Sequence, residues 1–340
     1  MLEEWPPPAA GAGGTVDRDD GNVRVGHTEV GRLWERLRDA VALAVIDAER
    51  PTRLLAIALL ADGHALIEDV PGVGKTVLAK AFSRALGLRF ARVQGTPDLL
   101  PGDVTGSSVL HAGEFRFVPG PIFTNVLLVD EINRATPRTQ SGLLEAMQER
   151  QVSVDGETHP LPDPFLVLAT ENPIELEGTF ELPEAQLDRF LVRVGVGYPS
   201  EDGERAVARR YRVAAEPLDA VPVVADADAI RAAREVVRTV LVTEDVERYL
   251  VGICRATRTH PDLRLGASPR ASVALYRASQ AWAALDGRDF VLPDDVAAVA
   301  RPVLAHRLLL DIDRELAGAA AEVVLVEVLE SVPIPMPTRS

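Results

Sequence analysis

Residues 68–76 read EDVPGVGKT and residues 126–131 read VLLVDE, and these two stretches decide the fold. The first is a glycine-rich loop ending in lysine and threonine, with an apolar stretch before it at residues 65–67 and a helical pattern after it at residues 76–86. Glycines let backbone N–H groups turn toward a phosphate, and the N-terminus of the following helix adds its positive dipole end. A strand, such a loop and a helix in this order predict a phosphate-binding loop.

The residue types in this loop suit a nucleotide polyphosphate. Gly72 and Gly74 supply the bend. Lys75 can reach the β- and γ-phosphates, and the Thr76 hydroxyl can ligate Mg²⁺. Asp69 stands where the strict pattern has its first glycine, so the pattern does not determine the detailed path of the loop. The alternative is a glycine-rich turn without a ligand. The residues that we expect to bind the nucleotide here are Pro71, Gly72, Val73, Gly74, Lys75 and Thr76.

The second stretch has four apolar residues followed by two acids, which is typical of a central parallel strand. Such strands present ligands at their carboxyl ends, beside the phosphate loop. Asp130 is expected to hold Mg²⁺, mostly through water, and Glu131 to polarise the attacking water. The alternative is a solvated strand end with two incidental acids. After a phosphate loop, the acidic pair favours nucleotide hydrolysis over binding alone.

Composition excludes several classes of protein. A chain of 340 residues is long enough for about two domains, and no apolar run reaches the ~18 residues of a membrane span. The single cysteine, Cys254, excludes an intrachain disulfide and fits a reducing, cytoplasmic location. With 36 basic and 51 acidic residues the net charge is −15, which disfavours a general nucleic-acid binder.

The pattern along the chain predicts four regions. Residues 1–30 form a disordered lead rich in Pro, Gly and Asp, without a signal-peptide pattern. An α/β core covers residues 31–199, starts with a helix that ends near Asp47 and carries hairpins at residues 109–117 and 151–161. A helical lid with its linker covers residues 200–332, and residues 333–340 are a tail. The helices expected in the lid cover residues 201–214, 228–239, 243–258, 268–286, 293–304 and 315–329.

In these features the chain resembles the AAA+ ATPases, and more narrowly the MoxR family. The segments that carry the resemblance are residues 68–76 (EDVPGVGKT), 94–103 (QGTPDLLPGD), 130–149 (DEINRATPRTQSGLLEAMQE), 169–173 (ATENP), 181–190 (ELPEAQLDRF) and 266–270 (GASPR). The resemblance implies an α/β fold: a P-loop AAA+ core, in which helices cover both faces of a parallel sheet and two β-hairpins are inserted, followed by a C-terminal all-α lid. It also implies ATP and Mg²⁺ as cofactors.

The resemblance assigns roles to three further residues. Asn172 resembles the sensor that positions the attacking water or touches the γ-phosphate, and an amide suits this because it can donate and accept at one place. Arg189 resembles an arginine finger that enters the neighbouring subunit's site, and Arg270 resembles a second sensor on the lid. The alternatives are a strand-end cap for Asn172, an ion pair with Asp188 for Arg189 and helix-start solvation for Arg270. Arg134 and Arg138 compete for the finger role.

The resemblance places Val45 and Ile46 at the adenine pocket, where the chain departs from the family. Asp47-Ala48 stands in place of the usual Gly-Gln, so contacts to the base are less well supported than those to the phosphates. By resemblance the hairpins face a central pore or the partner.

Three functions compete. The first is a homo-oligomeric ring, expected to be a hexamer, that couples ATP hydrolysis to chaperone-like maturation of a protein partner, which could be a von Willebrand factor A-domain protein. The second is a nucleotide-switched assembly scaffold in which hydrolysis is incidental. The third is a P-loop kinase or another enzyme that uses ATP on a small molecule, which the adjacent Asp130-Glu131 pair and the lid arginine disfavour.

Overall fold

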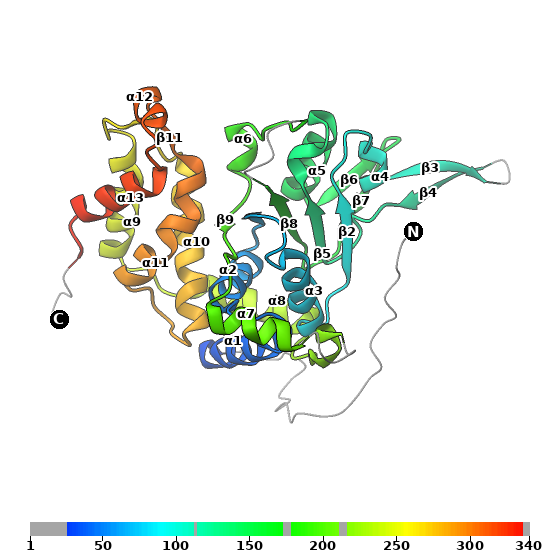
Figure 1. The fold of residues 1–340 in the computed structure, drawn as a ribbon, viewed down its shortest axis with the longest axis horizontal. Helices are drawn as coiled ribbons and strands as arrows, with labels where there is room; N and C mark the ends of the chain where they lie inside the picture. The colour runs from blue at the N-terminus through cyan, green and yellow to red at the C-terminus, as the bar shows by residue number, and fades with distance from the viewer. Residues whose placement is uncertain (1–25, 112–113, 173–177, 211–215, 336–340) are drawn as a thin grey trace.

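A five-stranded parallel sheet forms the centre of the computed structural model, which describes residues 26–111, 114–172, 178–210 and 216–335 (Figure 1). Its strands lie in the order β2-β5-β8-β1-β9. They are β1 (Ala65–Glu68), β2 (Phe90–Gln94), β5 (Val126–Asp130), β8 (Leu166–Glu171) and β9 (Val192–Val194). Because all neighbouring pairs are parallel, the carboxyl ends of the strands meet at one edge.

Helices cover both faces of this sheet, so its central strands are apolar on both sides. In β5, Leu128 belongs to a core shared with the N-terminal helices and the lid, whereas Leu127 belongs to a second core with α5 on the opposite face. The helices of this part of the chain are α1 (His27–Ala42), α2 (Glu49–Leu60), α3 (Lys75–Ala85), α4 (Pro101–Thr105), α5 (Pro137–Glu149) and α6 (Glu184–Leu187).

Some predicted boundaries in the core are wrong by a few residues. The helix α1 begins at His27, four residues before the expected start of ordered structure at Gly31, and it ends at Ala42 rather than near Asp47. Asp47 itself has a positive φ of 56°, which a helix cannot contain. The predicted disorder of residues 1–30 falls mostly on residues 1–25, which lie outside the described residues.

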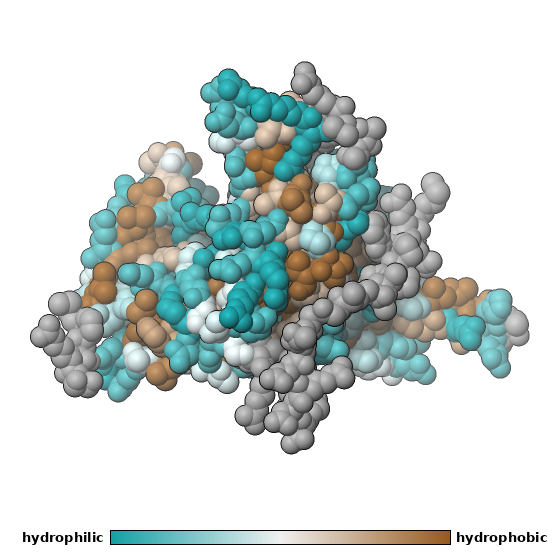
Figure 2. All heavy atoms as spheres, turned by 90° about the horizontal axis from the view of Figure 1, so that it is seen from below, coloured by the Kyte–Doolittle hydropathy of each residue, from teal (hydrophilic) through white to brown (hydrophobic). Residues whose placement is uncertain are grey.

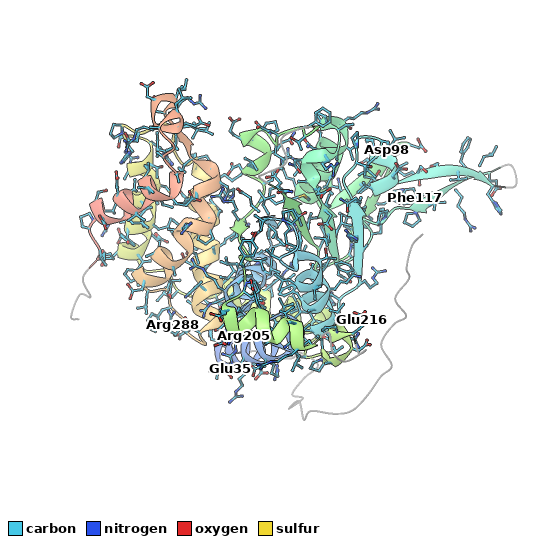
Figure 3. All side chains as sticks on the ribbon, in the orientation of Figure 1. Glu35, Asp98, Phe117, Arg205, Glu216 and Arg288 are labelled. Carbon is cyan, nitrogen blue, oxygen red and sulfur yellow. The ribbon has the colours of Figure 1, made fainter. Side chains whose placement is uncertain are left out.

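Both predicted hairpins are confirmed. The first joins β3 (Gly106–His111) to β4 (Glu114–Pro119), and the second joins β6 (Gln151–Val154) to β7 (Glu157–Pro160). The first projects from the body, and hydrophobic residues lie along it in Figure 2. Its exposed apolar side chains are Val109, Leu110, Phe115 and Val118. Phe117, which Figure 3 labels, lies at its base and stacks on His159 of the second hairpin with ring centroids 4.0 Å apart. The stacked pair joins the two hairpins.

The C-terminal part is helical, as predicted, with two differences. Its helices are α7 (Glu201–Arg210), α8 (Ala227–Arg238), α9 (Glu244–Thr257), α10 (Pro269–Leu285), α11 (Pro293–Leu304), α12 (Ile312–Leu316) and α13 (Ala321–Ser331). The prediction of a single helix over residues 315–329 is wrong. Gly318 has a φ of 77° and lies between two separate helices, α12 and α13. A short antiparallel pair, β10 (Leu263–Leu265) with β11 (Leu309–Leu310), was not predicted.

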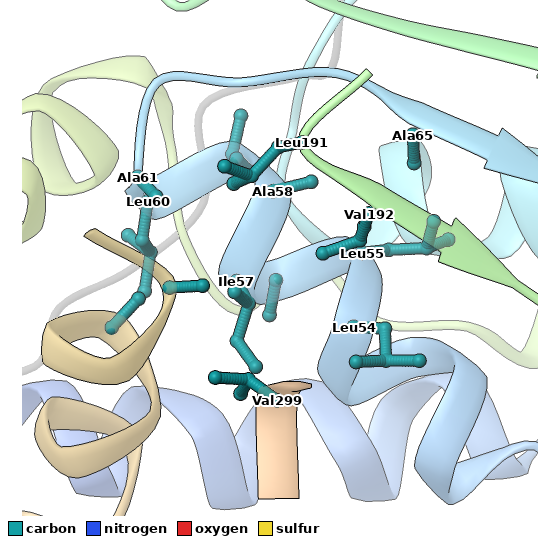
Figure 4. Close-up of a cluster of buried hydrophobic side chains, with 14 of the residues drawn as sticks. Leu54, Leu55, Ile57, Ala58, Leu60, Ala61, Ala65, Leu191, Val192 and Val299 are labelled. Carbon is teal, nitrogen blue, oxygen red and sulfur yellow. The ribbon is translucent and has the colours of Figure 1, made fainter. Parts of the chain in front are cut away.

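The core and the lid share one hydrophobic cluster. In Figure 4, Leu55 and Ile57 of α2 lie between Val192 of β9 and Val299 of the lid helix α11. The helix α8 falls within the predicted lid, yet its Arg234 donates to the Leu59 carbonyl at 2.8 Å. The lid helices α9 to α13 lie on the β9 side of the sheet, and α11 packs against β9 (Figure 1). The lid therefore meets the sheet at the edge next to β1, the strand that enters the phosphate loop. No helix in the described ranges is long and apolar enough to cross a membrane.

Candidate active site

The sheet edge brings the phosphate loop and the acidic pair together. The loop follows β1, the acids end β5, and β8 lies between these two strands. The Thr76 hydroxyl donates to Oδ2 of Asp130 at 3.4 Å, although 54 residues separate them. Asn172 follows β8 directly and is buried, with 5% of its surface exposed. The strand order therefore places all three predicted elements at one edge.

The phosphate loop has the backbone that its glycines predict. Gly72 has a φ of 86° and Gly74 a φ of 89°, in the left-handed region that glycine tolerates best. Gly74 immediately precedes α3, whose first residue is Lys75. The N–H groups of the first helical turn have no partners within a helix, so they are available to an anion at this position.

The hydrogen bonds of Asp69 give a physical reason for its departure from the strict loop pattern. Its carboxylate accepts from the backbone N–H groups of Val70 at 2.8 Å, Val196 at 2.7 Å and Gly197 at 2.5 Å. Its carbonyl accepts from Nζ of Lys75 at 2.6 Å. A glycine here could not tie the loop to the segment after β9, and the aspartate does so through two of these hydrogen bonds.

The Lys75 ammonium lies among carbonyls and acids. Its Nζ is also 3.5 Å from the Glu171 carbonyl. Burial lowers the pKa of Lys75, and the negative charges of Asp69, Asp130 and Glu131 oppose that effect. An anionic polyphosphate at this position would add to the opposing effect and favour the charged lysine.

The donors of the predicted metal site fit Mg²⁺, which prefers carboxylate and hydroxyl oxygens. Thr76 and Asp130 would hold it, and it would neutralise polyphosphate charge when bound. The Thr170 hydroxyl donates to Oδ1 of Asp130 at 2.9 Å and so orients the carboxylate. Arg92 of β2 donates to Oδ2 from Nε at 2.8 Å, so Mg²⁺ and Arg92 would compete for that oxygen.

Glu131 is held by groups that sequence reasoning did not identify. Its Oε2 accepts from Gln94 at 2.8 Å and from Nη1 of Arg134 at 3.0 Å, and its N–H donates to the Thr170 hydroxyl at 2.9 Å. Its φ is 54°, and a Cβ on Gly95 would lie 2.2 Å from its carbonyl oxygen. The signal that could have found Gln94 is its place at the end of β2, since it pairs in register with Asp130.

Three arginines were candidates for the finger role, and they lie in different surroundings. Arg134 donates to Glu131 within its own chain. Arg138 is exposed on the first turn of α5. Arg189 follows α6, and its Nε is buried with no hydrogen-bond partner among the described residues. The alternative ion pair of Arg189 with Asp188 is not formed, because the Asp188 carboxylate binds Arg307 at 2.7 Å.

The predicted adenine residues lie between α1 and α2. Val45 is buried in the core, and Ile46 is half-buried. Asp47 takes up the left-handed backbone that a glycine would favour there, and its Oδ2 accepts from the N–H of Ser200 at 2.9 Å and from its hydroxyl at 2.7 Å. These hydrogen bonds lower the pKa of Asp47. They connect Asp47, which stands in place of a glycine, to Ser200 at the start of the predicted lid linker.

A pair of acids beside the loop connects it to the lid. Glu68 of β1 pairs in register with Glu171 of β8. Burial, followed by the charge of Glu68, raises the pKa of Glu171 to about 7. Arg193 donates to Oε2 of Glu68 at 2.9 Å and also forms an ion pair with Glu322 of α13. The last lid helix is thus linked to the strand that enters the phosphate loop.

Sheet order, phosphate loop, acidic pair and helical lid together define an AAA+ ATPase, which confirms the predicted fold. Comparison with known families agrees: the model described as ATPase family associated with various cellular activities (AAA) matches residues 64–192. The model of the AAA lid domain matches residues 255–324.

Relatives identify the family more closely. The chain is 47% identical to the uncharacterized protein YeaC of Bacillus subtilis over 296 residues, which cover 86% of this chain and 92% of YeaC. It is 41% identical to the chaperone MoxR1 of Mycobacterium tuberculosis over 312 residues, or 88% of this chain and 82% of that protein. The chain belongs to the MoxR family of AAA+ ATPases. A solved structure of a candidate ATPase from Cytophaga hutchinsonii has a TM-score of 0.86 at 34% identity, covering 91% of this chain and 97% of that one.

Proposed function

We propose that this protein binds ATP with Mg²⁺ in the cytoplasm and hydrolyses it to ADP and phosphate. The observation that carries the proposal is the convergence of Lys75, Thr76 and Asp130 at the sheet edge, with Thr76 and Asp130 already in hydrogen-bond contact. Glu131 would polarise the attacking water, and Asn172 would position it. The geometry supports these roles because Lys75 and Thr76 begin α3 after the loop that follows β1, Asp130 and Glu131 lie at the end of β5, and Asn172 follows β8.

We further propose that the protein works as a ring, expected to be a hexamer, in which subunits share sites. Arg189 supports this, because its side chain is only partly buried and its Nε has no hydrogen-bond partner among the described residues, so its guanidinium is available to a phosphate of another subunit. Arg270 would act as a second sensor on the lid, where it is exposed in the first turn of α10. Hydrolysis would move the lid of residues 200–332 against the core of residues 31–199.

The work of the ring is proposed to be chaperone-like maturation of a protein partner, which could be a von Willebrand factor A-domain protein. The name of the relative MoxR1 supports a chaperone role. The projecting hairpin β3–β4 supports contact with a protein, because exposed apolar side chains such as Phe115 and Leu110 suit a polypeptide surface.

Phosphate release by the wild type and by Glu131→Gln tests hydrolysis. We expect at least a hundredfold lower turnover for the variant with ATP affinity within about threefold, because the amide retains the shape but cannot polarise water. Equal turnover would remove Glu131 from the mechanism. A pull-down with the same variant and ATP then identifies the partner, and Lys75→Ala is the matched control because it should not retain nucleotide.

A nucleotide-switched scaffold is the second candidate, and one observation favours it. Oε2 of Glu131 is engaged by Gln94 and Arg134, an arrangement that would keep hydrolysis slow. In a scaffold, Glu131→Gln would retain full activity in a partner assay while losing hydrolysis. Loss of both together would support the remodeller.

A further inference from the structure

Arg307 is a buried arginine that joins the lid to the segment between α6 and β9. Only 3% of its side chain is exposed, and it follows α11 in the turn Ala305–Arg307. Its Nε donates to Oδ1 of Asp188 at 2.7 Å. Burial lowers the pKa of Arg307, and the hydrogen bond to Asp188 opposes that effect. A buried pair of this kind is weak evidence for stability but constrains geometry strongly.

The same guanidinium holds the backbone on both sides of Arg189. Its Nη2 donates to the carbonyl of Asp188 at 3.2 Å and to that of Phe190 at 2.6 Å. Its Nη1 donates to the carbonyl of Leu191 at 3.2 Å. The residues directly before and after Arg189 are therefore bound to one rigid planar group. The Arg189 side chain itself makes no hydrogen bond to that group.

The other oxygen of Asp188 binds the residue that caps the helix of Arg270. Oδ2 accepts from the Ser268 hydroxyl at 3.3 Å. That hydroxyl also caps α10, because it accepts from the N–H of Ala271 at 3.2 Å. Arg270 lies in this capped first turn. One carboxylate thus connects the turn that carries Arg270 with the segment that carries Arg189.

We propose that Arg307 is a positioning residue that holds Arg189 in a fixed orientation relative to the lid. The direction in which Arg189 points would then depend on the lid orientation that is sensed at Arg270. The inference rests on the proposed function, in which Arg189 acts on nucleotide in the neighbouring subunit. The lid of one subunit would then control hydrolysis in the next.

Lysine cannot replace arginine in this role. Arg307 makes contacts in several directions through a planar fork, and a lysine ammonium has one nitrogen on a flexible stem. Arg307→Lys keeps the charge opposite Asp188 but cannot reach the Asp188, Phe190 and Leu191 carbonyls together. Misplacement of a catalytic group by about 1 Å costs on the order of a hundredfold in rate.

The test is a double-mutant comparison of ATP turnover by Arg307→Lys, Arg189→Ala and the combined variant. We expect the single variants to lower kcat at least tenfold while KM for ATP changes less than about threefold. In the Arg189→Ala background, Arg307→Lys should lower kcat by less than twofold, since a positioning residue has nothing left to position. A further tenfold loss would overturn the inference.

Mixed assemblies supply a readout that a general folding defect would not move. Glu131→Gln subunits have an intact Arg189 but no hydrolysis of their own, so adding them should raise turnover per Arg307→Lys subunit, as it should for Arg189→Ala. If Arg189→Ala is rescued and Arg307→Lys is not, the inference is wrong and the shared site stands. If neither is rescued, or Arg189→Ala has no effect, the shared site of the proposed function is wrong.

Arg53→Lys is the matched control. Arg53 of α2 also joins the core to the lid, through Asp286 at 2.5 Å, but at the opposite end of α10. The ATP turnover of Arg53→Lys should change less than twofold, and a loss of turnover equal to that of Arg307→Lys would overturn the inference. Thermal unfolding verifies that each variant folds. If Arg307→Lys does not fold, Asp188→Asn with the same comparison replaces it and carries the same expected outcomes.

Discussion

Replacing Glu171 by glutamine should stabilise the protein in neutral and alkaline solution. The Glu171 carboxyl is largely buried and lies in register with Glu68 on the next strand, and its pKa is raised from 4.5 to about 7. Ionising it therefore disfavours the folded state. Glutamine has nearly the same shape and cannot ionise, so Glu171→Gln removes that cost.

The magnitude follows from the difference between about 7 and 4.5. One pKa unit corresponds to about 1.4 kcal/mol, so the ionised Glu171 lowers the free energy of unfolding by about 3 kcal/mol. Between the two pKa values the folded state binds more protons than the unfolded state, so this loss grows as the pH rises from about 4.5 to about 7 and is constant above. The gain from Glu171→Gln should be about 1 kcal/mol at pH 5.5 and about 3 kcal/mol at pH 8.

Urea unfolding of both proteins at pH 5.5 and pH 8 measures this difference. Glu145→Gln, an exposed position on α5, is the control and should show no such pH dependence. If Glu171→Gln unfolds with the pH dependence of the wild type, or is less stable at pH 8, the reasoning about burial and the Glu68 charge is refuted.

Three further substitutions test the hydrogen bonds of the site. Thr170→Val removes the hydroxyl that binds both Asp130 and Glu131, so it should lower the free energy of unfolding by about 2 kcal/mol and weaken Mg²⁺-dependent ATP binding. Thr170→Ser keeps the hydroxyl and should be close to the wild type in urea unfolding and in a titration with ATP. Gly95→Ala places a Cβ 2.2 Å from the Glu131 carbonyl and should lower kcat at least tenfold with ATP affinity nearly unchanged; a fully active variant would show that the strand tolerates the shift. Asp69→Gly restores the strict loop pattern but loses three acceptor contacts, so thermal unfolding should show a loss of about 2 kcal/mol, and a gain in stability would contradict that role.

Much of the site was predictable because its signals are local. The glycine-rich loop between a strand and a helix predicted the bend at Gly72 and Gly74, where the structure has positive φ angles. The apolar run ending at Asp130 predicted a buried central strand, and the Asp155-Gly156 pair between two alternating segments predicted the second hairpin. Local patterns were less reliable where one residue changes the outcome, as at Gly318, which divides a predicted helix into α12 and α13.

The hydrogen-bond partners of the candidate catalytic groups were not predictable from these patterns. Gln94 and Glu131 are 37 positions apart, and Thr170 and Asp130 are 40 apart, yet each pair is in hydrogen-bond contact because parallel strands bring them to one edge. The alternative pairing of Arg189 with its neighbour Asp188 was reasonable in sequence, but Arg307, 119 positions away, takes that carboxylate.

The sequence by itself determined the phosphate loop, the acidic pair, the parallel α/β core and the helical lid, because periodicity, turn residues and motif spacing act within a few residues. Only the tertiary structure decided which groups Asp69 binds in place of a glycine, which side chains hold Glu131 and that Arg307 binds the backbone on both sides of Arg189. A polar side chain in a packed interior binds whichever group the fold places beside it. That choice depends on how the lid packs against the sheet, which no local pattern encodes.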